Sequence, residues 1–480
     1  MAKESIILGL KNLFRSWSGS SPQSIHELAG AGSYRRYFRI TGNGQRVIGA
    51  HNPDPSDNRA FHALTAHFRE HSLPVPEVYA KDDPKGICLL QDLGDISLFN
   101  LILRQQKEDD DNGQIRDLLK QALYDLTQFQ IKAGKSVDFS VCHPRPAFDR
   151  QSILWDLQYF KYYFLKLKKI PFDEQNLEDD FERFAGFLLD AESDYFMYRD
   201  FQSRNIMVHE GKLWYIDYQG GRRGPLQYDL VSFLFQARAA FSPSLRSELI
   251  RHYTGCLKDA PDFDEKSFFH YLDGFILVRM LQVLGAYGFR GYYERKAHFI
   301  ESIPYAVDNI RWFLNERKLP APMQQLEACL HRIVNDRELS GKQASEPSSL
   351  VVTVRSFSYK HGIPRDATVH GGGFVFDCRA LPNPGREEKY RDLTGLDTGV
   401  EQYLSEKKEV HEFMNNAEKL VTGSAEEYVK RGFTSLSVAF GCTGGQHRSV
   451  FCAEWLGRRL GKREDIEVIV KHTMVTGMTD

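Results

Sequence analysis

One short stretch near the middle of the chain constrains its fold and chemistry more than any other feature. Asp200 and Asn205 lie five positions apart, and Asp217 follows after two short apolar runs at 206–208 and 213–216. Those runs, with a Glu-Gly pair between them, predict two short strands in a hairpin. Such a hairpin would bring Asp217 back towards Asn205. Aspartate and asparagine alone at this spacing would be a weak signal, because both are common in loops.

These three polar residues match the needs of kinase-like phosphoryl transfer. The reaction uses a carboxylate that accepts the proton of the substrate hydroxyl, and an amide and a second carboxylate that hold magnesium ions against the ATP phosphates. We therefore predict that Asp200 is the catalytic base and that Asn205 and Asp217 are metal ligands. The alternative is a loop and hairpin with no chemistry.

A longer set of residues around this centre resembles a known family. Asp200 and Asn205 are followed by Ile-Asp-Tyr-Gln at 216–219, Arg-Gly-Pro at 223–225 and Tyr-Asp-Leu at 228–230. Together they resemble the aminoglycoside phosphotransferase-like kinases, over roughly the first two-thirds of the chain. Within that family the resemblance is closest to the anomeric amino-sugar kinases of the AmgK type, which phosphorylate C1 of N-acetylmuramate and N-acetylglucosamine.

The resemblance implies a fold, cofactors and substrate contacts. Residues 1–337 would form a protein-kinase-like α+β domain with a small β-rich N-terminal lobe and a helical C-terminal lobe, using ATP and Mg²⁺. Sugar contacts would lie near Asp156 and Arg204, and Asp229 would anchor the catalytic loop without reacting. Apolar residues at helical spacing predict helices over 115–132, 151–167, 173–188, 226–239, 245–257, 268–287 and 297–314.

Two segments of the N-terminal lobe are candidates for nucleotide binding. Small residues at Gly30, Gly32 and Ser33 would let backbone amides approach the ATP phosphates. Taken alone, such a turn is more often a plain hairpin. The resemblance further implies that backbone groups around Gln91 and Leu93 bind the edge of the adenine.

The predicted strands of this lobe lack one expected cation. Two or three strands are predicted over 24–50, with a turn at 41–44. Protein kinases carry a lysine on the third strand that pairs with the phosphates, whereas the segment 47–51 contains none. The candidates to replace it are His51, Arg35, Arg36 and Arg59.

Composition excludes some classes of protein. Lysine and arginine total 62 against 64 aspartates and glutamates, so the net charge of -2 gives no overall attraction to nucleic acid or anionic membranes. The seven cysteines are scattered and include no C-x-x-C pair, which favours reduced thiols in the cytoplasm. A short amphipathic helix is predicted over 1–16. We expect no signal peptide and no apolar stretch long enough to cross a bilayer.

A polar stretch at 338–348 predicts a linker, and a second domain follows over 349–480. Apolar runs at 350–357, 373–378 and 436–440 predict buried strands with helices between them. This pattern is typical of an α/β domain with a mostly parallel sheet.

The last of these strands leads into a glycine-rich turn at 441–449 and then into a helix through Leu460. Free amides and the helix dipole make such a turn an anion site. The dipole alone contributes about 0.3 to 2 kcal/mol, so Thr443, His447 and Arg448 would have to add charge and donors. Two alternatives stay open: a tight turn without a ligand, and the C-x-x-G-x-x-R-S loop of cysteine phosphatases, with Cys442 as nucleophile.

Most of this domain resembles the C-terminal domain of the RapZ RNase adaptor proteins, on residues 356–364, 376–384, 393–397 and 441–449. That domain binds glucosamine 6-phosphate and a regulatory RNA, and the resemblance also implies self-association. The chain ends almost without basic residues over 470–480, so RNA affinity would be weak at physiological salt. The implied ligand residues are Asp377, Arg379, Cys442, Thr443, Gly444, Gly445, His447 and Arg448.

The sequence thus predicts an ATP-dependent kinase that makes an amino-sugar 1-phosphate, joined to a domain that senses a phosphorylated amino sugar. One alternative is a kinase for another small hydroxyl compound, such as an aminoglycoside, choline or homoserine. Another is a regulatory adaptor whose kinase half only binds nucleotide. A third adds cysteine-phosphatase activity at 441–449.

Overall fold

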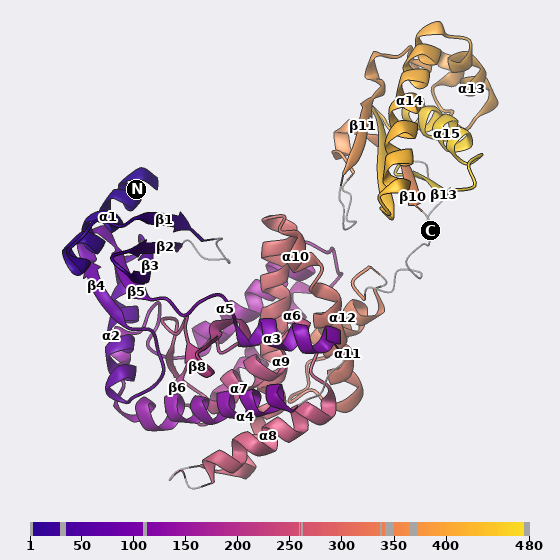
Figure 1. Ribbon diagram of the computed structural model, residues 1–480. Helices are drawn as coiled ribbons and strands as arrows, with labels where there is room; N and C mark the ends of the chain where they lie inside the picture. Colours follow the sequence, from indigo (N-terminus) through magenta and orange to yellow (C-terminus); the bar gives the residue numbers. More distant parts are fainter. Residues whose placement is uncertain are drawn as a thin grey trace. The chain divides into compact units, whose positions relative to one another are not determined.

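The computed structural model describes residues 3–28, 35–108, 113–258, 260, 263–336, 338–340, 350–364 and 372–474. It divides into two compact units, Met1–Gly341 and Lys342–Asp480 (Figure 1). Of the predicted linker, only 338–340 are described, and they pack with the first unit. Leu339 lies in its core, and Glu338 pairs with Lys168 at 2.9 Å.

The first unit begins with a five-stranded antiparallel sheet in the order β1-β2-β3-β5-β4. Asn43 and Gly44 both have positive φ, which is the conformation of a tight two-residue hairpin turn, as predicted at 41–44. The strands are β1 (Ser24–Glu27), β2 (Arg36–Gly42), β3 (Gln45–His51), β4 (Val78–Asp82) and β5 (Ile87–Gln91).

Helices cover both faces of this sheet. In β5, Leu89 packs with α1 (Lys3–Ser18), whereas its neighbours Cys88 and Leu90 pack into the core that holds α2 (Pro55–Glu70). This division follows from the alternation of side chains along a strand. Asp54 caps α2 by accepting hydrogen bonds from the first-turn backbone.

The rest of the first unit is mainly helical, as predicted. Two predicted helices differ from the structure. The segment 226–239 is helical only to Leu234 before a short 3-10 turn, and the segment 297–314 is broken at 301–302. The helices are α3 (Leu98–Glu108), α4 (Gln114–Thr127), α5 (Arg150–Phe160), α6 (Glu174–Leu189), α7 (Leu226–Leu234), α8 (Pro243–Leu257), α9 (Glu265–Tyr287), α10 (Ala297–Ile300), α11 (Ile303–Glu316) and α12 (Gln324–Asn335). Three of them, α4, α5 and α9, continue into the π-helical turns η2 (Gln128–Ala133), η5 (Lys161–Leu165) and η8 (Gly288–Tyr293).

One expectation about membranes needs a correction. The helical stretch Glu265–Tyr293, which contains α9, is long and apolar enough to span a bilayer by length and composition. Its most apolar window is 72% buried inside the protein. Packing therefore explains its composition: α9 is the central helix of the helical lobe.

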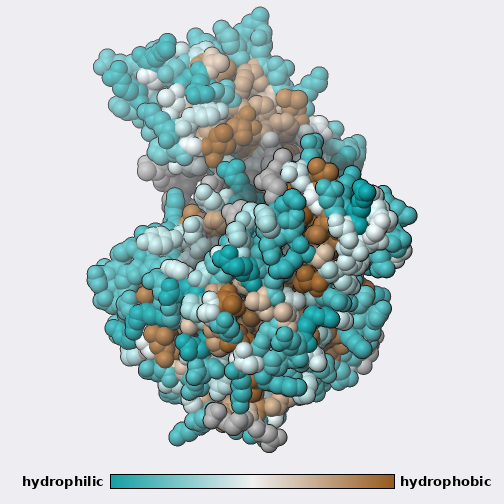
Figure 2. Space-filling model, turned by 90° about the vertical axis from the view of Figure 1, so that its left-hand side faces the viewer, coloured by the Kyte–Doolittle hydropathy of each residue, from teal (hydrophilic) through white to brown (hydrophobic). Residues whose placement is uncertain are grey.

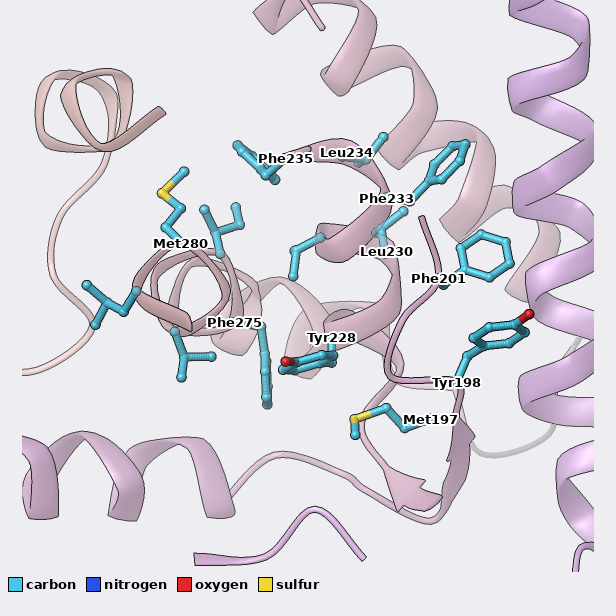
Figure 3. Close-up of a cluster of buried hydrophobic side chains, with 14 of the residues drawn as sticks. Met197, Tyr198, Phe201, Tyr228, Leu230, Phe233, Leu234, Phe235, Phe275 and Met280 are labelled. Atoms are coloured by element: carbon cyan, nitrogen blue, oxygen red, sulfur yellow. The ribbon is translucent and has the colours of Figure 1, made fainter. Parts of the chain in front are cut away.

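Short strands among these helices hold the catalytic segment. β6 (Tyr195–Met197) pairs with β9 (Arg222–Gly224), and β7 (Ile206–His209) pairs with β8 (Lys212–Tyr215). The second pair is the predicted hairpin. Figure 3 shows Tyr198 and Phe201 of the intervening loop side by side, with Phe201 next to Phe233 of α7. Every residue of α7 is buried.

The second unit contains a four-stranded, fully parallel sheet in the order β11-β12-β10-β13. The strands are β10 (Leu350–Ser358), β11 (Gly373–Asp377), β12 (Ser435–Cys442) and β13 (Ile466–His472), and the helices are α13 (Thr398–Ser405), α14 (Lys408–Lys430) and α15 (Arg448–Leu460). Its core is separate from those of the first unit. The prediction of an α/β domain with a parallel sheet is confirmed. The strand β13 was not predicted.

The face of the molecule in Figure 2 is mainly hydrophilic, with apolar residues in limited groups. Large apolar side chains that are exposed belong to different elements, such as Leu8 of α1 and Leu420 of α14. Scattered exposure of this kind is normal for a folded chain.

Candidate active site and anion loop

A buried carboxylate holds the backbone of the catalytic loop. The N–H groups of Tyr198 and Arg199 donate to Asp229 Oδ2 and Oδ1, at 2.6 and 2.8 Å. Asp229 lies in α7, is fully buried, and accepts a third hydrogen bond from Gln130 at 3.1 Å. The expectation that Asp229 anchors the loop is therefore confirmed.

Burial also sets the protonation of this anchor. Loss of water raises the pKa of Asp229 to about 7, although the hydrogen bonds from Tyr198, Arg199 and Gln130 favour its charged form. Asp229 therefore titrates near neutral pH.

The structure brings Asp200, Asn205 and Asp217 together. The side-chain amide of Asn205 donates to the backbone carbonyl of Asp200 at 2.9 Å and to Asp217 Oδ2 at 3.3 Å. The β7–β8 hairpin creates this contact, because it returns the chain so that the N–H of Ile216 donates to the Asn205 carbonyl at 3.0 Å. The arrangement fits a base beside two metal ligands.

Two residues of this centre have a left-handed backbone, Arg199 with φ 78° and Asp217 with φ 69°. This conformation costs a non-glycine residue on the order of 1 to 3 kcal/mol and persists where surrounding contacts fix it. Asp229 holds the N–H of Arg199, and the amide of Gln219 donates to Asp217 Oδ1 at 2.8 Å. Fixed strain of this kind clusters at functional sites.

The donor set fits a divalent cation that arrives with a nucleotide. Loss of water, and then the negative charge of Asp200, raise the pKa of Asp217, and a bound cation would relieve both effects. Among the described residues, no group of three or more His, Cys, Asp or Glu side chains is placed to hold a metal. Mg²⁺ needs no such group, since one or two carboxylates, phosphates and waters normally complete its shell.

Three arginines gather around Asp200, and none of them was among the predicted site residues. Arg279 of α9 places Nη2 at 3.9 Å from Asp200 Oδ1. Arg199 donates to both carboxylate oxygens of Asp156, at 2.9 and 2.6 Å. Burial, and then the charge of Arg199, lower the pKa of Arg222 to about 10. A lone arginine in the apolar sequence of α9 was the signal that could have revealed Arg279.

The predicted substrate residues have different surroundings. Asp156 is 6% exposed, and its carboxylate is engaged by Arg199, so it orients that arginine. Arg204 is exposed, with its guanidinium 5.9 Å from the centre of the Phe99 ring. Direct contact of either residue with a sugar stays a prediction.

The hinge candidates lie at the end of β5. Gln91 donates its backbone N–H to the Glu77 carbonyl at 2.9 Å, and Leu93 is buried. Asp92 between them accepts hydrogen bonds from Arg39 at 2.7 and 3.2 Å, which fixes the turn. Their role towards adenine stays a prediction, and the phosphate-covering residues Gly30, Gly32 and Ser33 lie outside the described residues.

In the second unit, the predicted anion loop joins β12 to α15. Its glycines are compatible with a tight turn, and Gly445 has a φ of 74°. The N–H of Gly445 lies 3.2 Å from Cys442 Sγ, and that sulfur lies 3.1 Å from Ser449 Oγ. The Thr443 carbonyl accepts a hydrogen bond from Ser358 at 2.7 Å, and Gly444 follows it. The thiol therefore organises the inside of the loop.

The charged candidates around this loop are engaged with protein atoms. Arg448 Nη1 donates to the carbonyls of Arg379 and Leu381 at 2.8 and 3.1 Å, which ties the loop to the end of β11. Arg379 forms a two-pronged pair with Asp377 at the surface. His447 Nε2 lies 2.9 Å from the Tyr390 carbonyl. The structure thus gathers all eight predicted residues near one end of the parallel sheet.

The kinase-like fold of the first unit and the grouping of Asp200, Asn205 and Asp217 are those expected of a phosphotransferase. The family model described as "Phosphotransferase enzyme family" matches residues 24–267, slightly more than half of the chain. The chain belongs to this family. A second model, described as "RapZ C-terminal domain", matches residues 350–476.

Curated relatives match part of the chain. A nucleotide-binding protein of Desulforudis audaxviator (strain MP104C) is 35% identical over 161 residues, which cover 31% of this chain and 53% of the relative. A nucleotide-binding protein of Azoarcus sp. (strain BH72) is 43% identical over 136 residues, covering 28% of this chain and 44% of the relative. The alignments span about half the length of these relatives or less.

Solved structures share low identity with the chain. The amicoumacin kinase hAmiN, in complex with AMP-PNP, Ca²⁺ and Ami, has a TM-score of 0.47 and 16% identity, over 68% of this chain and 97% of its own. Aminoglycoside phosphotransferase APH(4)-Ia, as a thermostable mutant in apo form, has a TM-score of 0.41 and 15% identity, over 63% and 98%.

Proposed function

We propose that the chain is a cytoplasmic, Mg²⁺-dependent kinase that phosphorylates the anomeric hydroxyl of an amino sugar of the N-acetylmuramate or N-acetylglucosamine type. Asp200 accepts the proton of that hydroxyl, and Asn205 and Asp217 hold the metal that bridges the ATP phosphates. The product is a sugar 1-phosphate. The phosphotransferase family match and the placement of these three side chains support the reaction class.

We choose this acceptor because of the charged side chains around Asp200. The carboxylate of Asp156 neutralises the charge of Arg199. Arg279 instead donates a hydrogen bond to the neutral Gln282 at 2.7 Å, and Arg222 donates one to a backbone carbonyl. Arg279 and Arg222 therefore keep positive charge near Asp200, while the bound metal would take up the charge of the neighbouring Asp217. A polycationic aminoglycoside or choline would be repelled at this place. An N-acetylated sugar is neutral, and N-acetylmuramate adds a carboxylate, so both fit.

A panel of acceptors tests this assignment. ATP consumption should occur with N-acetylmuramate or N-acetylglucosamine and be near background with kanamycin, choline and homoserine. Reducing the sugar to its alditol removes the anomeric hydroxyl and should abolish turnover. Phosphorylation of the alditol would show that another hydroxyl reacts, and turnover of an aminoglycoside would contradict the charge argument.

We also propose that the loop 441–449 binds the phosphate of an amino-sugar phosphate without hydrolysing it. The loop precedes α15, where backbone N–H groups and the helix dipole favour an anion. Cys442 is only 3% exposed and already contacts Gly445 and Ser449, so its thiol is badly placed to attack an ester. The match to the RapZ C-terminal domain supports the ligand class.

Calorimetry on the full chain without ATP tests the loop. Glucosamine 6-phosphate should bind, and Cys442→Ser should keep most of the affinity because serine can replace the sulfur as an acceptor. Release of phosphate by the native chain, lost in Cys442→Ser, would instead establish a cysteine phosphatase, which the C-x-x-G-x-x-R-S pattern also allows.

A further inference from the structure

The N-terminal lobe needs a cation for the nucleotide phosphates, and β3 supplies no lysine. We propose that Arg35, directly before β2, binds these phosphates in place of that lysine, and that Asp57 of α2 holds its guanidinium. This inference rests on the proposed function only in requiring that the first unit bind ATP, and not on the identity of the acceptor.

Arg35 and its neighbour Arg36 point to different faces of the sheet. Adjacent residues of an extended chain point to opposite faces of a sheet. Arg36 pairs with Glu27 at 2.6 Å and lies over Phe38, which belongs to the cluster under α1. Arg35 instead donates to Asp57 Oδ2 through Nε and Nη2, at 3.2 and 2.6 Å, and so faces α2.

The other two candidates do not supply a charge beside the metal ligands. His51 is 4% exposed, and burial, followed by nearby positive charge, lowers the pKa of its ring, which favours the neutral form. Arg59 donates to Ser56 at 2.9 Å and lines a separate cavity with Lys81 and His143.

A chain of packed rings places Arg35 near Asp217. The guanidinium of Arg35 lies 5.6 Å from the centre of the Phe61 ring, and that ring stacks on Tyr218 at 5.7 Å. Tyr218 directly follows Asp217.

The pair of Arg35 and Asp57 has the properties of a phosphate site. Its carboxylate comes from the first turn of α2 and also accepts a hydrogen bond from Asn52 at 2.6 Å, which fixes its position. The Arg35 side chain is 11% exposed, so little water screens its charge. The planar donors of a guanidinium match phosphate oxygens, and Arg35 carries them while it is bonded to Asp57 and interacts with Tyr37.

Nucleotide binding by the full chain, measured by calorimetry without any sugar, tests the proposal. Arg35→Ala should weaken ATP binding about ten- to a hundred-fold, the usual loss for a hydrogen bond to a charged group, while adenosine binding should be unchanged. Arg35→Lys should recover part of the affinity for ATP. Arg36→Ala is the matched control and should bind both ligands normally.

The contrast between ligands separates a lost phosphate contact from general damage. Equal ATP affinity of Arg35→Ala and the native chain would overturn the proposal, and so would parallel losses for ATP and adenosine in both Arg35 variants. Failure of the chain to phosphorylate any amino sugar would leave these binding results unchanged, so the two proposals fail separately.

Discussion

At the scale of single residues, the proposed base Asp200 is the side chain on which turnover should depend. Its side chain is 45% exposed, beside Arg279 and within the strained loop that Asp229 holds. Asp200→Asn keeps the shape but removes the base, so the rate should fall about 100- to 10,000-fold. Steady-state ATP consumption with the true acceptor measures this.

A matched control for that substitution is Asp194→Asn. Asp194 is an exposed carboxylate paired loosely with Arg223 at 3.5 Å, outside the centre. It should keep native turnover. Near-native turnover of Asp200→Asn would remove Asp200 from the role of base.

Asp229 gives stability a dependence on pH. Its pKa rises from 3.8 to about 7 on folding, so the folded state holds a proton that the unfolded state has released between these values. The contribution to stability is complete below pH 3.8 and is lost as pH rises through 7. Asp229 should therefore contribute a decline in the free energy of unfolding whose slope approaches about 1.4 kcal/mol per pH unit in that window.

Urea unfolding of the native chain and of Asp229→Asn at several pH values checks this slope. The asparagine variant has no proton to lose and should show a smaller decline, whatever its absolute stability. Identical slopes in the two proteins would mean that Asp229 does not titrate in this range.

At the scale of elements, α9 depends on close approach to α5 and η5. A Cβ added to Gly288, just past the end of α9, would lie 1.9 Å from the Tyr163 carbonyl oxygen. Gly288→Ala must therefore push backbone apart and should destabilise the fold by about 1 to 3 kcal/mol. Thermal unfolding measures the loss.

Gly255 in α8 is the control, because nothing lies within 4 Å of the equivalent added Cβ. Gly255→Ala should stabilise by up to about 1 kcal/mol through helix propensity. A Gly288→Ala variant as stable as Gly255→Ala would show that α9 can move away from η5 at little cost.

At the scale of the whole molecule, features set by local chemistry could be predicted from the sequence. The β7–β8 hairpin, the grouping of Asp200 with Asn205 and Asp217, and the parallel sheet of the second unit follow from residue types and short spacings. The family resemblance rested on the same residues.

Features that arise from distant contacts were harder to predict. The sequence marks Arg279 as a lone arginine in an apolar helix, but it does not show that this arginine reaches Asp200. The break at 301–302 lies within an apolar period that continues on both sides, so periodicity alone predicted one helix. β6 and β9 are three residues each, too short for an alternating pattern to register.

Helix α2 joins the two lobes of the first unit through Thr65, whose hydroxyl lies 2.7 Å from that of the buried Tyr218. The same helix carries Asp57, and Tyr218 follows Asp217. By thermodynamic linkage, two ligands that favour the same position of a shared element each raise the binding affinity of the other by the same factor. Nucleotide and metal should thus bind cooperatively, and Thr65→Val, which touches neither, should reduce the cooperativity when ATP affinity is titrated with and without Mg²⁺.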